Sequence, residues 1–192
     1  RIQRRRGMDP QVVIRPSSLQ IFLGTLSGYE KGLLEEKQLK QASFHEDKIL
    51  NSHTTFHEEK CEIDFDSYKM DFYQKKFGNN KVETVAHKYL QGMQWVLSYY
   101  THGISSYSWY YKEFYAPFLC DLTLACDKYK GEQLPFGKPY PPFVQLLCVI
   151  PPKYSNILPK PLSNFMTDEK YNLKKYYPET FEIDVSGKRQ EW

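Results

Sequence analysis

Helical periodicity between residues 82 and 101 is the feature that most constrains the fold of this chain. Apolar side chains recur there at intervals of three or four residues, at Val82, Val85, Ala86, Tyr89, Met93, Val96, Leu97 and Tyr100. This spacing places them on one face of a helix. Leu90 and Trp95 widen that face, and Gly103 suits the end of a helix. We expect a helix from Val82 to Thr101, buried on more than one side, in a mainly α fold.

A dense aromatic segment follows this helix directly. Seven of the fourteen residues from 105 to 118 are aromatic, namely Tyr107, Trp109, Tyr110, Tyr111, Phe114, Tyr115 and Phe118. They form neither a helical stripe nor the alternation of a strand, so we expect an irregular segment. From the residues alone it is a core element, a protein-binding surface, or a platform on which bases or sugars stack.

Two other helices are expected before it. Ser17 and Ser18 follow Pro16 and suit the start of an amphipathic helix over residues 17–40. Its apolar residues fall at helical spacing, at Leu19, Phe22, Leu23, Leu26 and Tyr29. The spacing of Phe65, Tyr68, Phe72 and Phe77 predicts a second helix that ends near Gly78.

The C-terminal third predicts short elements joined by long proline-rich connectors. Four prolines between Leu134 and Pro142 favour an extended connector. Residues 143–150 suggest a short buried helix, and residues 162–166 another helical turn. Residues 181–185 alternate like a strand, and Ser186-Gly187 suits a turn, so we expect a short C-terminal β-hairpin.

Residues 1–16 and 41–66 give weaker signals. The first segment begins with four arginines among six residues and suggests a basic linker. Residues 41–66 are polar and without period, so we expect a variable, poorly ordered insert.

Two metal-ligand patterns occur within or beside this insert. His53, His57 and Cys61 are four residues apart, which on a helix would place three zinc-type ligands on one face. In an extended chain, the alternating carboxylates of Glu62, Asp64 and Asp66 would line up for Mg²⁺. No fourth zinc ligand is near the first set, and acidic runs are usually solvated, so we expect no metal in this chain.

Composition narrows the class of protein. Four scattered cysteines without a CxxC pair favour a reducing, intracellular setting. No apolar run reaches the length of a membrane span. The net charge of +3 permits an anionic partner without demanding one. No phosphate-binding glycine loop or nucleophile–base pair stands out, and His87, His102 and Asp121 suggest structural roles.

From residue 72 onward the chain contains a series of specific motifs. In order, these are Phe72-Tyr73-Gln74-Lys75-Lys76-Phe77-Gly78, Gln94-Trp95-Val96-Leu97-Ser98-Tyr99-Tyr100-Thr101-His102-Gly103, Ser106-Tyr107-Ser108-Trp109-Tyr110-Tyr111, Tyr115-Ala116-Pro117-Phe118, Gly137-Lys138-Pro139-Tyr140 with Pro142-Phe143, and Tyr177-Pro178-Glu179-Thr180-Phe181-Glu182-Ile183-Asp184. Their order and spacing resemble those of the Xrn-type 5′→3′ exoribonucleases. About two-thirds of the chain takes part in this resemblance, whereas residues 1–71 match weakly.

The resemblance implies that residues 67–192 are the family's helical middle domain, incomplete at its C-terminus. The ending Gln190-Glu191-Trp192 is slightly closer to the cytoplasmic branch than to the nuclear one. We therefore expect a cytoplasmic protein, with nuclear residence as the alternative.

The same resemblance implies an activity for the parent protein. Family members degrade single-stranded RNA from a 5′-monophosphate end, and their Mg²⁺-binding carboxylates lie in an N-terminal nuclease region against which the middle domain packs. That region is not in this chain, so we expect no catalytic residue here and no RNA cleavage by this chain alone. No specificity for DNA is expected.

Within the domain, the resemblance implies an aromatic side chain that stacks on the entering bases. Trp109 is the candidate, with Tyr107 as a weaker neighbour where the family has a second tryptophan. Tyr110, Tyr111 and Asp121 are candidates for supporting roles.

Several positions depart from the family pattern. Lys112, Glu113 and Phe114 stand where the family usually has Pro, Tyr and His, and Cys120 and Val144 replace a usual Ser and Glu. These departures leave an alternative open, in which the chain belongs to a degenerate, non-catalytic member that serves as a scaffold or interaction domain.

Overall fold

The computed structural model describes residues 13–40, 45–181 and 183–188. Most of the predicted basic linker lies outside these residues. Among the described residues the protein is mainly helical, with one small two-stranded sheet, and the predicted fold class is confirmed. The chain divides into two compact units. One runs to Gly137 and takes in the chain again from Ser186, and the other is Lys138–Val185.

The described elements follow one another in the order α1 (Pro16–Lys40), α2 (Lys48–Ser52), β1 (Thr54–Phe56), β2 (Cys61–Ile63), α3 (Phe65–Phe77), α4 (Val82–His102), α5 (Leu119–Cys126), α6 (Pro142–Val149), the 3-10 helix η1 (Pro152–Ile157), α7 (Lys160–Thr167) and the 3-10 helix η2 (Lys174–Tyr176). The helices predicted over residues 17–40, 65–77 and 82–101 are confirmed as α1, α3 and α4. Helix α5 was not predicted, because eight residues are too few to show a clear period.

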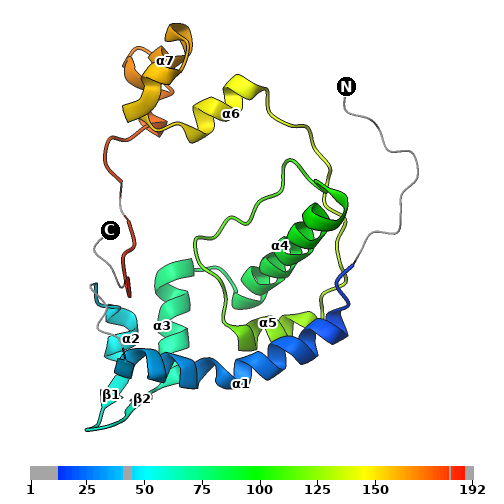
Figure 1. The fold of residues 1–192 in the computed structure, drawn as a ribbon, viewed down its shortest axis with the longest axis vertical. Helices are drawn as coiled ribbons and strands as arrows, with labels where there is room; N and C mark the ends of the chain where they lie inside the picture. Colours follow the sequence, from blue (N-terminus) through cyan, green and yellow to red (C-terminus); the bar gives the residue numbers. More distant parts are fainter. Residues whose placement is uncertain (1–12, 41–44, 182, 189–192) are drawn as a thin grey trace. The chain divides into compact units, whose positions relative to one another are not determined.

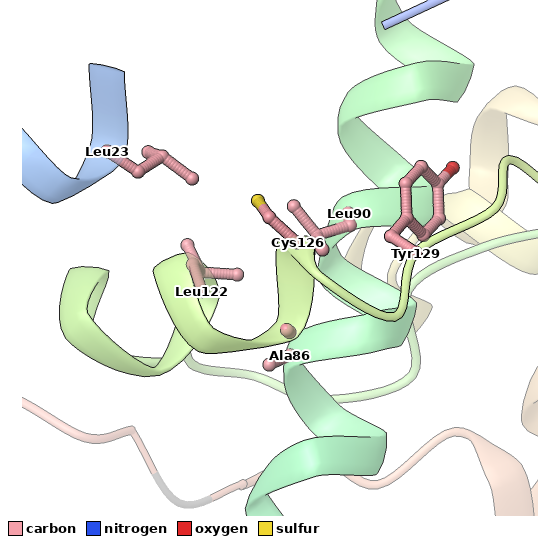
Figure 2. Packing of buried hydrophobic residues seen from close by; sticks show 7 residues of the cluster. Leu23, Ala86, Leu90, Leu122, Cys126 and Tyr129 are labelled. Atoms are coloured by element: carbon pink, nitrogen blue, oxygen red, sulfur yellow. The ribbon is translucent and has the colours of Figure 1, made fainter. Parts of the chain in front are cut away.

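In the first unit, α5 packs between α1 and α4 (Figure 1). Figure 2 shows Leu23 of α1 on one side of Leu122 and Cys126 of α5, with Ala86 and Leu90 of α4 on the other. All five are nearly inaccessible to solvent. Burying a leucine of this kind contributes about 1.5–3 kcal/mol, so each of the three buried leucines helps to hold the three helices together.

Helix α1 is buried along less of its apolar stripe than its spacing suggested. Leu23 is its one buried residue, whereas the side chains of Phe22 and Tyr29 are 58% and 65% exposed.

A second, aromatic cluster joins α3 to the segment before α5. The ring of Phe72 lies 5.0 Å from that of Phe118 and 6.0 Å from that of Tyr115, edge-on in both cases. Tyr73 and Phe77, both buried, pack against the same group. Part of the aromatic segment is therefore core. Edge-on ring pairs add about 0.5–1.5 kcal/mol each beyond the area that they bury.

Residues 45–66 are folded, contrary to the expectation of a poorly ordered insert; residues 41–44 lie outside the described part. Strands β1 and β2 pair antiparallel, with Thr54 opposite Ile63. Leu50 of α2 and Ile63 of β2 are buried against Tyr68 of α3. The prediction failed because the segment is made of elements of three to five residues, too short to give a period.

The second unit contains α6, η1, α7 and η2, of which α7 packs against both 3-10 helices. Leu158 and Met166 are its buried residues among those described. The predicted helix over residues 143–150 is confirmed as α6. The prediction that it is buried is wrong, since no residue of α6 is buried in the structure.

The C-terminal hairpin predicted over residues 181–192 is not formed by the described residues of that stretch, and residues 182 and 189–192 lie outside them. The turn at Ser186-Gly187 is present, but the backbone of Gly187 and Lys188 forms hydrogen bonds with His45 instead of with residues 181–185. The amide of Gly187 donates to the carbonyl oxygen of His45 at 3.0 Å, and the amide of His45 donates to that of Lys188 at 3.1 Å. Among the residues that the structure describes, the two-stranded hairpin is β1–β2.

Candidate functional site

Residues 103–118 run between α4 and α5 without helix or strand, as the irregular spacing of their aromatics predicted. We call this segment the aromatic loop. It contains each of the aromatic residues that the sequence singled out for stacking.

A buried serine holds the loop in shape. Ser106 is 1% exposed, and its Oγ donates a hydrogen bond of 2.6 Å to the carbonyl oxygen of Pro135. The same Oγ accepts hydrogen bonds from the backbone amides of Ser108 and Trp109, at 3.3 and 3.1 Å. A serine that accepts from amides two and three residues ahead bends the chain locally. Ser106 thereby fixes the course of the backbone that leads to Trp109.

Contacts from α4 and from the proline-rich connector support the same turn. The indole Nε1 of Trp95 donates to the carbonyl oxygen of Ser106 at 3.0 Å. The amide of Tyr107 donates to the carbonyl oxygen of Phe136 at 2.8 Å, and their two rings meet edge-on at 5.2 Å. Within the connector, Gly137 has a positive φ of 67°, and a Cβ there would lie 2.9 Å from Ser108 Oγ, so only glycine fits.

Trp109 lies half-buried against α4. Its ring contacts the helix at Gly92, where an added Cβ would lie 3.0 Å from Cη2 of the indole. The absence of a side chain at position 92 therefore allows the ring to approach the helix backbone closely. Loop and helix together determine where the indole lies.

An open, largely aromatic groove of about 650 Å³ runs beside this ring. Its lining combines the Trp109 side of the loop with one face of α4 and Ile14, which lies two residues before α1. The lining residues are Ile14, Tyr89, Gly92, Met93, Trp95, Val96, Leu97, Tyr100, Trp109 and Tyr111. None of these described lining residues carries a charge. The groove can bind a flat apolar or π-bearing group, but these residues offer no ion pair to a phosphate.

Tyr111 supports the groove wall. Its ring meets that of Tyr89 edge-on at 5.3 Å, and its hydroxyl donates to the carbonyl oxygen of Tyr115 at 2.7 Å. Burial, with a smaller effect from the negative charge of Glu113, raises the pKa of Tyr111 to about 12. Tyr111 is therefore a neutral hydrogen-bond donor under all ordinary conditions.

The other aromatic candidates lie apart from Trp109. Tyr107 is half-buried against Phe136 and does not line the groove. Tyr110, a candidate for a supporting role, is 66% exposed and does not line the groove either. Of the two aromatics proposed for stacking, the structure places Trp109 alone beside the groove.

Asp121 is held within the fold. Tyr73 donates its hydroxyl to Asp121 Oδ2 at 2.7 Å, and Lys69 Nζ lies 2.8 Å from Oδ1. Burial alone would lower the pKa of Lys69, but its hydrogen bonds to Asp121 and Cys120 outweigh burial and raise it. Burial and the bond to Asp121 raise the pKa of Tyr73. These contacts tie α3 to α5 and give Asp121 a structural role.

The first metal-ligand pattern is not realised. His53 follows α2 and lies 3.0 Å from Asp71, His57 lies in the turn between β1 and β2, and Cys61 is in β2. The Cys61 thiol donates to the carbonyl oxygen of Glu35, and burial raises its pKa.

The carboxylate pattern is not realised either. Asp64 is the N-cap of α3 and accepts hydrogen bonds from the amide and hydroxyl of Ser67, which lower its pKa. Among the residues described, no group of three or more His, Cys, Asp or Glu side chains could hold a metal ion.

The sequence pointed to Trp109, which lies at the centre of the site. It did not point to Gly92 and Ser106, which hold Trp109 in place. Gly92 carries a recognisable signal, because a glycine inside a strong helical pattern often marks a close approach. Ser106 carries none, since its partner Pro135 is twenty-nine residues away in sequence.

None of the described helices is both long and apolar enough to cross a membrane.

Comparison with known proteins agrees with the motifs. The sequence model of the family described as "Xrn1 helical domain" matches residues 25–192. The chain is 42% identical to 5′-3′ exoribonuclease 1 of Homo sapiens over 137 residues, which are 68% of this chain and 8% of the human protein.

Relatives of both numbered types occur among the matches. The chain is 33% identical to 5′-3′ exoribonuclease 1 of Saccharomyces cerevisiae over 162 residues, 81% of this chain and 10% of that protein. It is 39% identical to 5′-3′ exoribonuclease 2 of Schizosaccharomyces pombe over 131 residues, 65% of this chain and 13% of that protein. The chain thus spans about a tenth of the length of these relatives. It belongs to the 5′-3′ exoribonuclease family, in which residues 25–192 are the helical domain.

Proposed function

We propose that this chain is the RNA-facing helical domain of an enzyme that degrades 5′-monophosphorylated single-stranded RNA, and that Trp109 stacks on the bases as they enter. The observation that carries the proposal is the position of Trp109, which lies at an aromatic groove and is fixed there by Ser106 and by α4. Every base has a π-face, so stacking accepts any sequence. An enzyme that removes nucleotides one after another requires that tolerance.

The uncharged lining of the groove supports the view that bases and phosphates are bound by different regions of the parent protein. Phosphates bind to lysine, arginine, backbone amides or metal ions. The described lining residues have no such side chain. We therefore assign base stacking to this domain, and we assign the 5′-phosphate pocket and the Mg²⁺-binding carboxylates to another region of the parent protein. Hydrolysis of a phosphodiester at Mg²⁺ needs such a carboxylate cluster.

The test is a Trp109→Ala substitution in the full-length protein, assayed on a 5′-monophosphorylated RNA. Loss of one stacked base costs about 1–3 kcal/mol, so we expect degradation to slow by about 5- to 150-fold. Trp109→Phe should retain part of the rate, because phenylalanine still stacks. The matched control is Phe114→Ala, which removes a 96% exposed aromatic from the same loop. If Trp109→Ala and Phe114→Ala degrade RNA equally fast, Trp109 does not stack on the substrate.

A second candidate function is a non-catalytic scaffold. It is favoured by Phe114, which is almost fully exposed where the family usually has histidine. The same assay separates the two functions, because a scaffold predicts that even the unsubstituted full-length protein binds RNA or a partner without degrading it.

We further propose that the parent protein is cytoplasmic, because residues Gln190-Glu191-Trp192 of this chain are slightly more similar to the cytoplasmic branch. Fluorescence microscopy of the tagged full-length protein tests this, and nuclear accumulation would favour the alternative.

A further inference from the structure

A second pocket lies on α4 beside the Trp109 groove. It has a volume of about 480 Å³ and is lined by residues of α4, by the start of the aromatic loop and by residues 131–136, which lead into the proline-rich connector. Trp95 lines both this pocket and the groove. We call it the Glu132 pocket, because Glu132 is the one charged side chain among its described lining residues. A volume of this size is typical of sites for small ligands.

Two anchors hold the chain that borders the pocket. Glu132 Oε1 lies 3.1 Å from His87 Nε2, and Gln91 donates its side-chain amide to Glu132 Oε2. Three residues further along, the carbonyl oxygen of Pro135 accepts the hydrogen bond from Ser106. The segment 132–135 is therefore tied to α4 at one end and to the aromatic loop at the other, so the fold itself determines the shape of the pocket.

A buried hydroxyl in the lining lacks a partner. Ser105 lines the Glu132 pocket, and its Oγ is almost inaccessible to solvent. No described residue forms a hydrogen bond with this Oγ. Buried polar atoms are normally hydrogen-bonded, so an unpaired hydroxyl at a pocket indicates that a ligand supplies the partner.

Charge and aromatic rings narrow the class of ligand. The side chains that bond to Glu132 are His87 and Gln91, and no described lysine or arginine forms an ion pair with it. Trp95 and Phe136 place aromatic rings in the same lining, which contains no lysine or arginine among its described residues. A carboxylate beside aromatic rings attracts a cation, and it repels a phosphate.

We propose that the Glu132 pocket binds a guanidinium group. A guanidinium is planar and always charged, it offers two parallel N–H donors to a carboxylate, and it stacks on aromatic rings. One of its remaining N–H groups can donate to Ser105 Oγ. An ammonium group fits less well, because it is a strongly hydrated point charge without a plane. A neutral nucleoside fits less well, because it leaves the charge of Glu132 without a counter-ion.

The guanidinium comes either from a free alkylguanidine or from an arginine side chain of a separate protein. Isothermal titration calorimetry of the full-length protein with three probes tests the shared chemistry and separates the sources. The probes are ethylguanidine, the peptide acetyl-Gly-Arg-Gly-amide, and the same peptide with citrulline, in which an uncharged ureido group replaces the guanidinium.

We expect the arginine peptide to bind with a Kd of about 0.1–1 mM, which is ordinary for a ligand of this size. The citrulline peptide should bind at least about tenfold more weakly, because it lacks the charge. Ethylguanidine that binds within about fivefold of the arginine peptide would assign the pocket to a free alkylguanidine. Weaker binding of ethylguanidine would assign it to an arginine within a chain.

Two substitutions locate the binding site. Glu132→Gln should weaken binding of the arginine peptide at least about tenfold, because it removes the charge-assisted pair. Ser105→Ala should weaken it about two- to tenfold, and it leaves the anchor at Glu132 intact. The matched control is Glu62→Gln, which removes an exposed carboxylate of β2 in the same unit and outside the pocket.

Three outcomes would overturn the proposal. They are equal binding of the arginine and citrulline peptides, binding that Glu132→Gln and Ser105→Ala leave unchanged, and no binding of the arginine peptide at concentrations up to about 10 mM. Tighter binding of adenosine than of the arginine peptide would likewise replace the guanidinium by a neutral nucleoside. The proposal does not depend on stacking at Trp109, so a failed stacking test would leave it standing.

Discussion

At the scale of single residues, the site depends on one contact between an indole and a glycine. Gly92 lets the Trp109 ring lie against the backbone of α4, and a Cβ at position 92 would lie 3.0 Å from the ring, which would have to shift by a few tenths of an ångström. A Gly92→Ala substitution should therefore affect stability and function differently. Alanine favours the helix, but its Cβ displaces the Trp109 ring.

We predict that Gly92→Ala leaves the domain as stable as before, or more stable, and slows degradation of RNA. Alanine gains up to about 1 kcal/mol in helix propensity over glycine, but its Cβ would lie 3.0 Å from Trp109 Cη2. Melting temperature and degradation rate of the full-length protein measure the two effects. The control is Gly28→Ala in α1, where nothing lies within 4 Å of the added Cβ. A rate lowered equally by both substitutions would contradict the role of the Gly92 contact.

A second prediction concerns pH and Tyr111. Its pKa is raised from 10.0 to about 12 in the folded protein, so the unfolded chain loses the proton first as pH rises. The contribution to stability is therefore fully present below pH 10 and is lost as pH rises through about 12. We expect the wild-type protein to lose more stability than Tyr111→Phe between pH 9 and pH 11.5.

Urea unfolding of both proteins at the two pH values measures this difference. Other tyrosines titrate in both proteins, so their effects cancel in the comparison. A stability difference between the two proteins that stays constant with pH would show that Tyr111 has no raised pKa.

At the scale of elements, the aromatic loop is held by partners distant in sequence. Ser106 joins it to the connector at Pro135, and Trp95 joins it to α4. The loop has no regular hydrogen-bond ladder, so these few bonds define its shape.

We predict that Ser106→Ala destabilises the domain by about 1–3 kcal/mol, because it removes a buried hydroxyl that bonds two backbone amides and a carbonyl oxygen. It should also slow RNA degradation, since Trp109 loses the bond that orients its backbone. Chemical denaturation and the degradation assay measure the two effects. Ser105→Ala is the control, because its buried Oγ has no hydrogen-bond partner among the described residues. Equal effects of the two substitutions would contradict the role given to Ser106.

The elements differ in how far the sequence determines them. Long periodic helices such as α3 and α4 follow from apolar spacing alone. The β1–β2 hairpin and α5 do not, because elements of three to eight residues are too short to show a period. Leu50, Ile63 and Leu122 can be recognised as core residues only from the residues that they contact. Helix α6 was expected to be buried because it is apolar. In the structure none of its residues is buried.

At the scale of the whole molecule, the carboxylates of the described residues decide what this domain contributes to the account. Their carboxylates form no metal-binding cluster, and Asp121 is held by Lys69 and Tyr73. The family motif pointed to Trp109 as the candidate, and Trp109 lines the groove. The groove itself did not follow, because Ile14, Tyr89 and Trp109 come together only in three dimensions.

We therefore predict that residues 1–192 alone do not cleave a 5′-monophosphorylated RNA in the presence of Mg²⁺. Gel analysis of an end-labelled substrate measures this, with the full-length protein as the positive control. Cleavage by the isolated chain that a chelator abolishes would place a catalytic metal site here and contradict the account.

The central claim is that a base of the substrate stacks on Trp109. The most direct measurement uses the full-length protein with a 5′-monophosphorylated, hydrolysis-resistant RNA that carries 5-iodouridine near its 5′ end, a base that cross-links to aromatic rings stacked on it. After irradiation, mass spectrometry locates the modified residue. The account predicts a cross-link at Trp109 that Gly92→Ala weakens. Efficient cross-linking elsewhere in the protein, with none at Trp109, would contradict it.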